Sequence, residues 1–284
     1  MEGAPLNELS SKIAKLGLVP GPVADVAPEK VHMSRRQILQ GLACGSVVVM
    51  LPACTYNEEL GRSQLLFVSS GQMAQLGASA WNDMRRQQRV TNDPRYVSQM
   101  QRVAPGVIEA SGGNPREWDV QVFEDESINA FALPGGKIGF YTGILDFMEN
   151  DDEIATVVGH EVAHVNYNHS GERYSQSVLA QSGLSVAQVA TSGSRYQAPM
   201  MAVLGVGAQY GVLLPFSRKH ELEADRFGLR YMNRAGYNPN RAVGFWEKMA
   251  SRGNNAPPEY LSTHPSGSTR IAQMRREIAL LDNA

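Results

Sequence analysis

The sequence His-Glu-Val-Ala-His at residues 160–164 brings metal-binding and acid–base side chains into one helical turn. Residues four apart share a helix face, so His160 and His164 can present two imidazole nitrogens to one metal ion. Zinc suits such a site because it accepts nitrogen and oxygen ligands in tetrahedral geometry. Glu161 is rotated to the flank of that face, where it can take a proton from water without being a ligand.

A catalytic zinc needs a third protein ligand and an open position. Glu221 and Asp225 are four residues apart and share a predicted helix face, whereas Glu223 is rotated away from both. These positions predict that Glu221 is the third ligand and that Asp225 orients a metal-binding imidazole. A solvated acidic helix face is the alternative interpretation.

His264, in the sequence Thr-His-Pro at residues 263–265, is a further candidate ligand in a predicted loop. A loop can move in a way that a core helix cannot. If His264 reaches the zinc, it fills the position that water needs, and the site rests switched off. Two alternatives stay open: His264 packs or caps its loop, or it leaves the metal and stabilises the transition state. We predict a displaceable fourth ligand.

Several segments together resemble the HtpX-type and CAAX-prenyl-protease-type family of gluzincin metallopeptidases. The similarity is greatest to its soluble bacterial periplasmic lipoproteins and to the related mitochondrial Oma peptidase. The segments that carry it are Asn129–Gly136, residues 160–164, Ser217-Arg218 with Glu221, Ala224 and Asp225, and Thr263-His264-Pro265 followed by Arg270.

This resemblance implies a zinc peptidase with one metal ion per chain and Glu221 as the third ligand. It also places Arg270 beside the site, where the residue would stabilise the tetrahedral intermediate. Membrane-embedded members have transmembrane helices around the site. This sequence has no apolar run of about 18 residues, so their prenyl-protein substrates are not expected here.

Helical and strand patterns in the sequence predict an α+β fold that is mainly helical, with a small antiparallel sheet beside the metal helix. The resemblance implies that this fold is zincin-like. Residues 55–118 are expected to be helical, 119–143 to form the sheet, and 150–284 to supply the metal-binding helices and an apolar segment. Within that last part, residues 176–216 are nearly uncharged and form either a buried hairpin or a mobile flap.

A peptide substrate is expected to add as a strand to an exposed sheet edge. The strand before the metal helix is the candidate edge, and Gly139 and Gly143 would leave room for a second backbone. An ordinary capped edge strand is the alternative. The predicted substrate strand comprises Ile138, Gly139, Phe140 and Tyr141.

The composition excludes several other classes of protein. Lys and Arg number 26 against 28 Asp and Glu, which argues against a nucleic-acid partner. Two cysteines exclude a disulfide-rich scaffold.

The first 53 residues are expected to direct export and to lie outside the folded domain. Residues 1–32 are predicted to be a disordered extension or to follow a misassigned start. Residues 33–53 have two arginines, an apolar stretch and small residues before Cys54, as in a lipoprotein signal peptide. The arginine pair also resembles a twin-arginine export motif. Cys54 would carry lipid, and Thr55 favours the outer membrane over the inner one.

These features predict one zinc endopeptidase domain at residues 54–284, lipid-anchored in the periplasm. Its expected substrates are misfolded or misassembled envelope proteins. The alternative is a chaperone-like client-binding lipoprotein with a latent metal site, but the intact Glu161 favours an enzyme. The sequence leaves the oligomeric state open.

We predict that Cys54→Ser releases the protein from the membrane as a soluble precursor or periplasmic form, because the lipid attachment atom is lost. Cell fractionation and mass spectrometry of the mature chain measure this. A Cys54 that carries no lipid in the wild-type protein, or a variant that stays membrane-associated, would contradict the lipid anchor.

Overall fold

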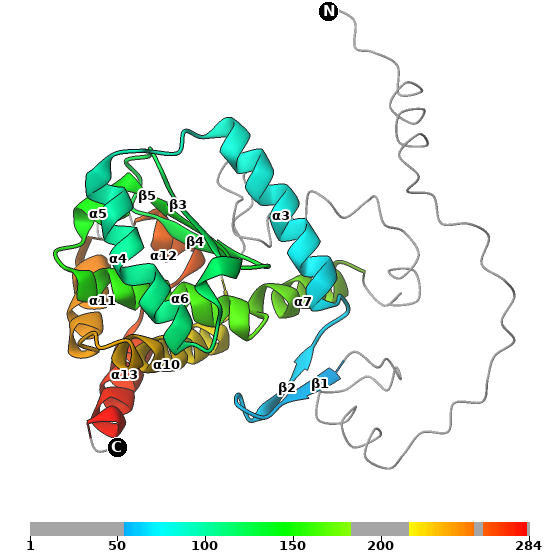
Figure 1. Cartoon of the computed structure of the whole chain (residues 1–284). Helices are drawn as coiled ribbons and strands as arrows, with labels where there is room; N and C mark the ends of the chain where they lie inside the picture. The colour runs from blue at the N-terminus through cyan, green and yellow to red at the C-terminus, as the bar shows by residue number, and fades with distance from the viewer. Residues whose placement is uncertain (1–53, 183–215, 253–257, 283–284) are drawn as a thin grey trace, which may run out of the picture.

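The computed structural model describes residues 54–182, 216–252 and 258–282 (Figure 1). The predicted signal segment and most of the apolar segment 176–216 lie outside these residues, so both stay predictions. Within the described part of the chain, no helix combines the length and the apolar character needed to cross a membrane.

The predicted α+β class is confirmed, with helices surrounding a small sheet. Three strands form this sheet in the order β3-β5-β4: β3 (Asp119–Phe123), β4 (Ala130–Leu133) and β5 (Lys137–Tyr141). β5 pairs with β3 in parallel and with β4 in antiparallel orientation. The sheet is therefore mixed, whereas the sequence analysis expected an antiparallel one.

The prediction that residues 138–141 form a substrate-binding edge is wrong, because β5 is the central strand and is paired on both sides. The two glycines have other neighbours. A Cβ on Gly139 would lie 2.1 Å from the Phe131 ring, and one on Gly143 would lie 2.1 Å from the Glu126 carbonyl oxygen. Both glycines thus accommodate parts of this chain, and β3 and β4 are the edges.

Helices carry three of the predicted ligands: His160 and His164 lie on α6, and Glu221 lies on α10. Asn150 caps α6 by accepting a hydrogen bond from the Glu153 amide, while the Glu153 carboxylate accepts from the Glu149 amide. The helices are α3 (Ser70–Gln87), α4 (Pro94–Ala110), α5 (Thr142–Phe147), α6 (Asp151–Asn166), α7 (His169–Ser182), α10 (Arg218–Arg234), α11 (Asn240–Ser251), α12 (Glu259–Thr263) and α13 (Ser268–Leu281), with a 3₁₀ turn at Pro115–Glu117.

An antiparallel hairpin of β1 (Cys54–Asn57) and β2 (Arg62–Leu65) precedes these helices, where the sequence analysis expected helix. Its strands have four residues each and are largely polar, so no alternation of apolar residues marks them. The hairpin lies beside α7 and away from the three-stranded sheet (Figure 1).

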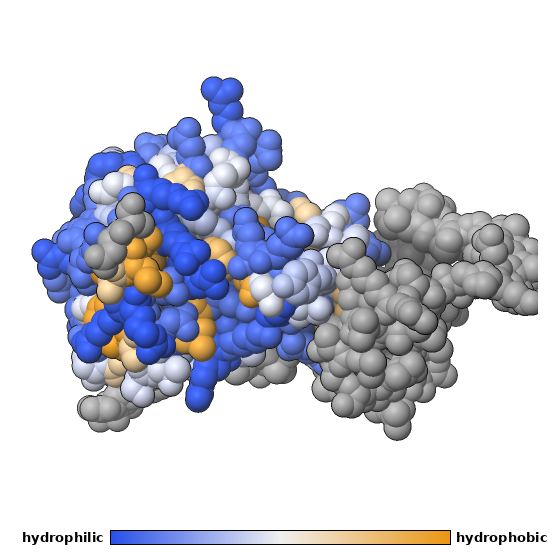
Figure 2. All heavy atoms as spheres, turned by 90° about the horizontal axis from the view of Figure 1, so that it is seen from below, coloured by the Kyte–Doolittle hydropathy of each residue, from blue (hydrophilic) through white to orange (hydrophobic). Residues whose placement is uncertain are grey.

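Both faces of the sheet are buried. Successive strand residues point to opposite sides, so each strand contributes side chains to both faces. One face carries Phe123, Phe131, Leu133 and Tyr141, which pack with Met73 and Trp81 of α3. The other face packs with α4 and α6 in the main core. Seen from below, the described surface is mostly hydrophilic with scattered hydrophobic patches (Figure 2).

Helices α6 and α10 cross in close contact at two glycines. A Cβ on Gly159 would lie 2.7 Å from the Gly228 carbonyl oxygen, and one on Gly228 would lie 2.9 Å from the Gly159 carbonyl carbon. The backbones therefore touch where any side chain would separate them. Gly159 immediately precedes His160, so this contact sets how near the two helices bring their polar residues.

We predict that Gly159→Ala lowers the free energy of unfolding by about 1–3 kcal/mol, because the added methyl group overpacks the helix crossing. Metal affinity should fall as well. Thermal or urea unfolding and metal titration measure the two effects.

Gly244→Ala in α11 is the matched control. No atom lies within 4 Å of a Cβ at Gly244, and alanine favours helix, so this variant should gain up to about 1 kcal/mol. A Gly159→Ala protein as stable as the wild type would show that the glycine contact is not required.

Candidate metal centre

Four buried side chains from three parts of the chain meet at one point: His160, His164, Glu221 and His264. One ligand atom from each lies within 4.8 Å of all the others. α6 supplies the first two, the first turn of α10 supplies Glu221, and His264 follows α12. The structure thus brings together the four residues that the sequence predicted as ligands.

The separations within this cluster match a tetrahedral zinc site. His160 Nε2 lies 3.0 Å from His164 Nε2 and 3.2 Å from His264 Nδ1. A Glu221 oxygen lies 3.3 Å from His164 Nε2 and 3.1 Å from His264 Nδ1. Ligands about 2.0–2.1 Å from a tetrahedral zinc are about 3.3–3.4 Å apart, so the donor atoms and their spacing fit this metal.

Asp225 lies behind His160, as predicted. Its Oδ1 is 3.0 Å from His160 Nδ1, so the other imidazole nitrogen is directed toward the ligand cluster. Arg270 holds Asp225 with two hydrogen bonds, of 2.7 Å from Nε and 2.6 Å from Nη2. Asp225 therefore has the contacts of a residue that orients a ligand.

Arg270 departs from its predicted role toward the substrate. Its Nη1 lies 2.8 Å from Glu221 Oε2 and also faces the carbonyl oxygens of His264 and Pro265. With Asp225, these acceptors engage all three guanidinium nitrogens. The residue is 3% exposed and lies over the Trp246 ring. These contacts suit a residue that holds carboxylates in place.

Glu161 is buried on the flank of the cluster, and its Oε1 accepts a 2.8 Å hydrogen bond from the Tyr260 hydroxyl. Burial, together with the charge of Glu161, raises the pKa of Tyr260 well above its ordinary value. The phenol therefore stays protonated and remains a donor. Sequence reasoning missed Tyr260, although its place four residues before His264 was a usable signal.

The members of the cluster differ in charge, since burial lowers the pKa of His164 well below its ordinary value and keeps that ring neutral. Burial alone would lower the pKa of His160, but the negative charge of Glu221 and the hydrogen bond to Asp225 raise it to about 9. Burial would raise the pKa of Glu221, yet the charges of His264, Arg270 and His160 hold it well below its ordinary value. Glu221 is therefore ionised, which is the state a metal ligand requires.

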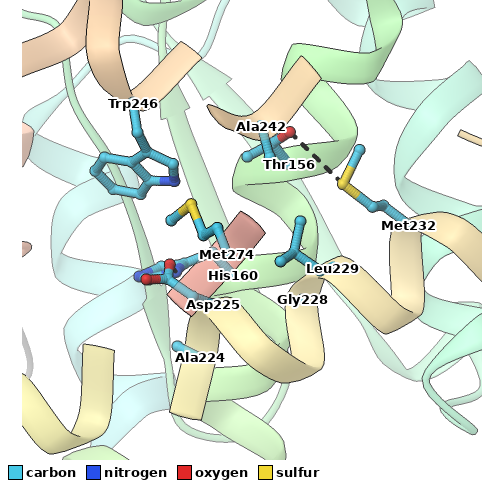
Figure 3. Close-up of a pocket in the computed structure, with 10 residues that line it drawn as sticks. All are labelled: Thr156, His160, Ala224, Asp225, Gly228, Leu229, Met232, Ala242, Trp246 and Met274. Carbon is cyan, nitrogen blue, oxygen red and sulfur yellow. Dashed lines mark hydrogen bonds and ion pairs between the residues drawn. The ribbon is translucent and has the colours of Figure 1, made fainter. Parts of the chain in front are cut away.

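A small cavity lies beside His160, between α6, α10, α11 and α13 (Figure 3). Its volume of about 10 Å³ is enough for about one water molecule and far too small for a substrate. Thr156 and Met232 close one end with a 3.7 Å hydroxyl–sulfur contact. The lining residues are Thr156, His160, Ala224, Asp225, Gly228, Leu229, Met232, Ala242, Trp246 and Met274.

Comparison with known proteins gives a match to peptidase family M48 over residues 92–278. This range includes every candidate metal ligand, Glu161, Asp225 and Arg270. The predicted lipid site Cys54 and the β1–β2 hairpin precede it.

Two kinds of curated relative are similar to this chain. Mitochondrial metalloendopeptidase OMA1 of Arabidopsis thaliana is 34% identical over 205 residues, which are 72% of this chain and 41% of the relative. OMA1 of Schizosaccharomyces pombe is 37% identical over 195 residues, 64% and 55% of the two chains. The beta-barrel assembly-enhancing protease of Escherichia coli is 26% identical over 225 residues, 76% and 46%. The chain spans about half the length of these curated relatives.

Proposed function

Since this chain belongs to peptidase family M48, as its resemblance predicted, we propose that it is a zinc-dependent endopeptidase. Metallopeptidases of this family use zinc, and the buried donor set fits that metal. The observation that carries the proposal is a buried carboxylate, Glu161, that flanks the four-ligand cluster without belonging to it. A client-binding protein has no need of such a base.

In the proposed reaction, His160, His164 and Glu221 would hold a zinc ion, which would supply Lewis acidity toward water and the scissile carbonyl. Glu161 accepts the proton of the attacking water as the new C–O bond forms. It then gives that proton to the leaving amine as the C–N bond breaks. Asp225 and Arg270 keep His160 and Glu221 in position throughout.

We infer that the substrate pairs with β4 instead of β5. The Tyr141 amide donates to the Asn129 carbonyl, which makes these two residues a hydrogen-bonded pair of the antiparallel ladder. Such pairs alternate with non-hydrogen-bonded pairs, so the amide and carbonyl groups of Ala130 and Ala132 point away from β5. An extended peptide could bond to these groups.

We also propose that His264 is the displaceable fourth ligand of a resting enzyme. In the described conformation, its Nδ1 completes the set of four donors. Its backbone is tied to the sheet through α12, because the Tyr260 amide donates to the carbonyl oxygen of Ile128, just before β4. By the same alternation, that carbonyl lies on the side of the strand that faces away from β5. A peptide that extends along this edge would therefore compete with α12.

We further propose that the protein acts in the bacterial envelope, lipid-anchored at Cys54 in the periplasm and on the outer membrane. The predicted signal sequence supports this location, and the name of the Escherichia coli relative connects that protein with β-barrel assembly. Misfolded or misassembled envelope proteins are the proposed substrates. Capture of clients by the Glu161→Gln variant tests this part, and capture of no envelope protein would contradict it.

The catalytic assignment predicts that Glu161→Gln lowers the peptidase rate by about 10²–10⁴-fold because the general base is lost. Zinc content should stay near one ion per chain. Casein cleavage, with and without a chelator, and metal analysis measure the two quantities.

Glu149→Gln, on an exposed side chain near the start of the same helix, is the control and should keep full activity. His160→Ala should lose both metal and activity. A Glu161→Gln protein without zinc would contradict the assignment of Glu161 as base.

If His264 is a displaceable fourth ligand, His264→Ala should raise the peptidase rate at saturating zinc, because the fourth ligand position becomes free. Rates on a soluble peptide, measured beside zinc content, provide the test. An unchanged rate would assign His264 to packing. A large fall in the peptidase rate with zinc retained would assign His264 to catalysis. Either result would overturn its role as a displaceable fourth ligand.

The β4 assignment predicts that Ala132→Pro raises KM for a peptide about 2- to 10-fold, since one outward amide is lost. Edge strands tolerate proline, so zinc content and unfolding temperature should hold. Ala132→Ser keeps the amide and serves as the control. Equal KM values for the two variants would remove β4 from substrate binding.

A further inference from the structure

A second group of buried polar side chains lies behind His164. The ring nitrogen of His164 that does not face the ligand cluster, Nδ1, lies 3.0 Å from Nδ1 of His169. The other nitrogen of His169, Nε2, lies 3.2 Å from Glu223 Oε2. His169 is fully buried at the start of α7, and Glu223 belongs to α10.

These contacts select the proton positions on both imidazoles. If His164 binds the metal through Nε2, its proton is on Nδ1 and is donated to Nδ1 of His169. His169 must then carry its own proton on Nε2, which faces the Glu223 carboxylate. The Glu223 carboxylate, 3.2 Å from that nitrogen, therefore favours the tautomer that leaves His164 Nε2 free for a metal.

Arg62 of β2 holds that carboxylate in place. Its Nε and Nη2 donate to the two oxygens of Glu223 at 2.5 and 2.7 Å. Its Nη1 and Nη2 donate to the two oxygens of Glu172 at 2.8 Å each. The Arg62 and Glu223 side chains are 10% and 13% exposed, so water competes little for these bonds.

Glu172 is itself fixed by further partners. Gln64, on the same strand as Arg62, donates to its Oε2 at 3.0 Å and to the Tyr167 carbonyl at 2.7 Å. His220 Nε2 lies 3.2 Å from the same oxygen, and the His220 ring stacks on His169. The hairpin, α7 and α10 thus form one connected support.

The support of His164 parallels that of His160. The contacts behind His160 lead to Asp225 and then to Arg270. The contacts behind His164 lead to His169, then to Glu223 and then to Arg62. Each series starts at a ligand and ends at an arginine that bonds both oxygens of a carboxylate. Helix geometry turns Glu223 away from the face of Glu221 and Asp225, and on that other face it meets His169 and Arg62.

We propose that Arg62 is a positioning residue of the metal centre, which acts through Glu223 and His169 to fix the orientation and tautomer of His164. This role rests on the proposed zinc site. It extends that site to the β1–β2 hairpin, which precedes residue 92, where the family match begins.

The experiment measures zinc affinity by chelator competition and the visible spectrum of the cobalt-substituted protein. Arg62→Ala, Glu223→Gln and His169→Phe should each weaken zinc binding by about 10- to 100-fold and alter the cobalt spectrum. Arg62→Lys keeps the positive charge but cannot form the bidentate hydrogen bonds, so it should retain only part of the zinc affinity. The Arg62→Lys variant also replaces Arg62→Ala as the test if the alanine variant fails to fold.

Arg230→Ala is the matched control, since Arg230 also forms an ion pair on α10, with Glu277. It should leave zinc affinity and the cobalt spectrum unchanged. Unfolding temperatures of all variants in chelator separate loss of stability from loss of metal binding. Because Arg62 is proposed to act through Glu223, the double variant Arg62→Ala with Glu223→Gln should bind zinc no more weakly than Glu223→Gln alone.

Wild-type zinc affinity and spectrum in Arg62→Ala and Arg62→Lys would overturn the role of Arg62 alone. Additive losses in the double variant would overturn the route through Glu223. A wild-type protein that binds no zinc, or a His160→Ala variant that binds it normally, would instead overturn the metal site itself and this inference with it.

Discussion

The contact between α6 and α10 at Gly159 and Gly228 is the constraint on which the metal centre depends. Two ligands come from one of these helices and the third from the other. A difference of an ångström between helix axes would separate Glu221 from the two histidine donor atoms that now lie 3.3–3.4 Å from it. The glycines remove the side chains that would impose that difference, and the ion pairs across the crossing keep the helices together.

The second requirement is a balance of buried charge. Three carboxylates lie near the cluster at Glu161, Glu221 and Asp225, and each is at most 3% exposed. Burial of an ionised carboxylate is unfavourable unless partners compensate it. Arg270 compensates two of them, and Tyr260 donates to the third. A divalent cation adds the charge that the donor set is arranged to receive.

Local patterns in the sequence predicted most of this centre, because helix periodicity is a local property. The spacing of His160, Glu161 and His164 fixed their relative directions, and the same rule selected Glu221 and Asp225. These features need no knowledge of how distant segments pack.

Non-local pairing was the part that the sequence could not determine. Strand order depends on which segments meet, so the central position of β5 was missed, and residues 138–141 were assigned to an edge. The polar β1–β2 hairpin has no periodic signal of its own. Its significance lies in Arg62, whose partners are 110 and 161 residues away in the chain.

The short helix α12 connects three features of the site that the sequence treats as separate. The Tyr260 hydroxyl donates a hydrogen bond to Glu161, the Tyr260 amide donates to the Ile128 carbonyl just before β4, and His264 completes the ligand cluster. A displacement of α12 would therefore free the base, the edge and the fourth ligand position together. Because all three contacts are made by residues 260–264, a peptide that replaces the bond at Ile128 would also weaken the hold of His264. If the substrate pairs with β4 as proposed, this geometry would join that pairing to the opening of the metal centre.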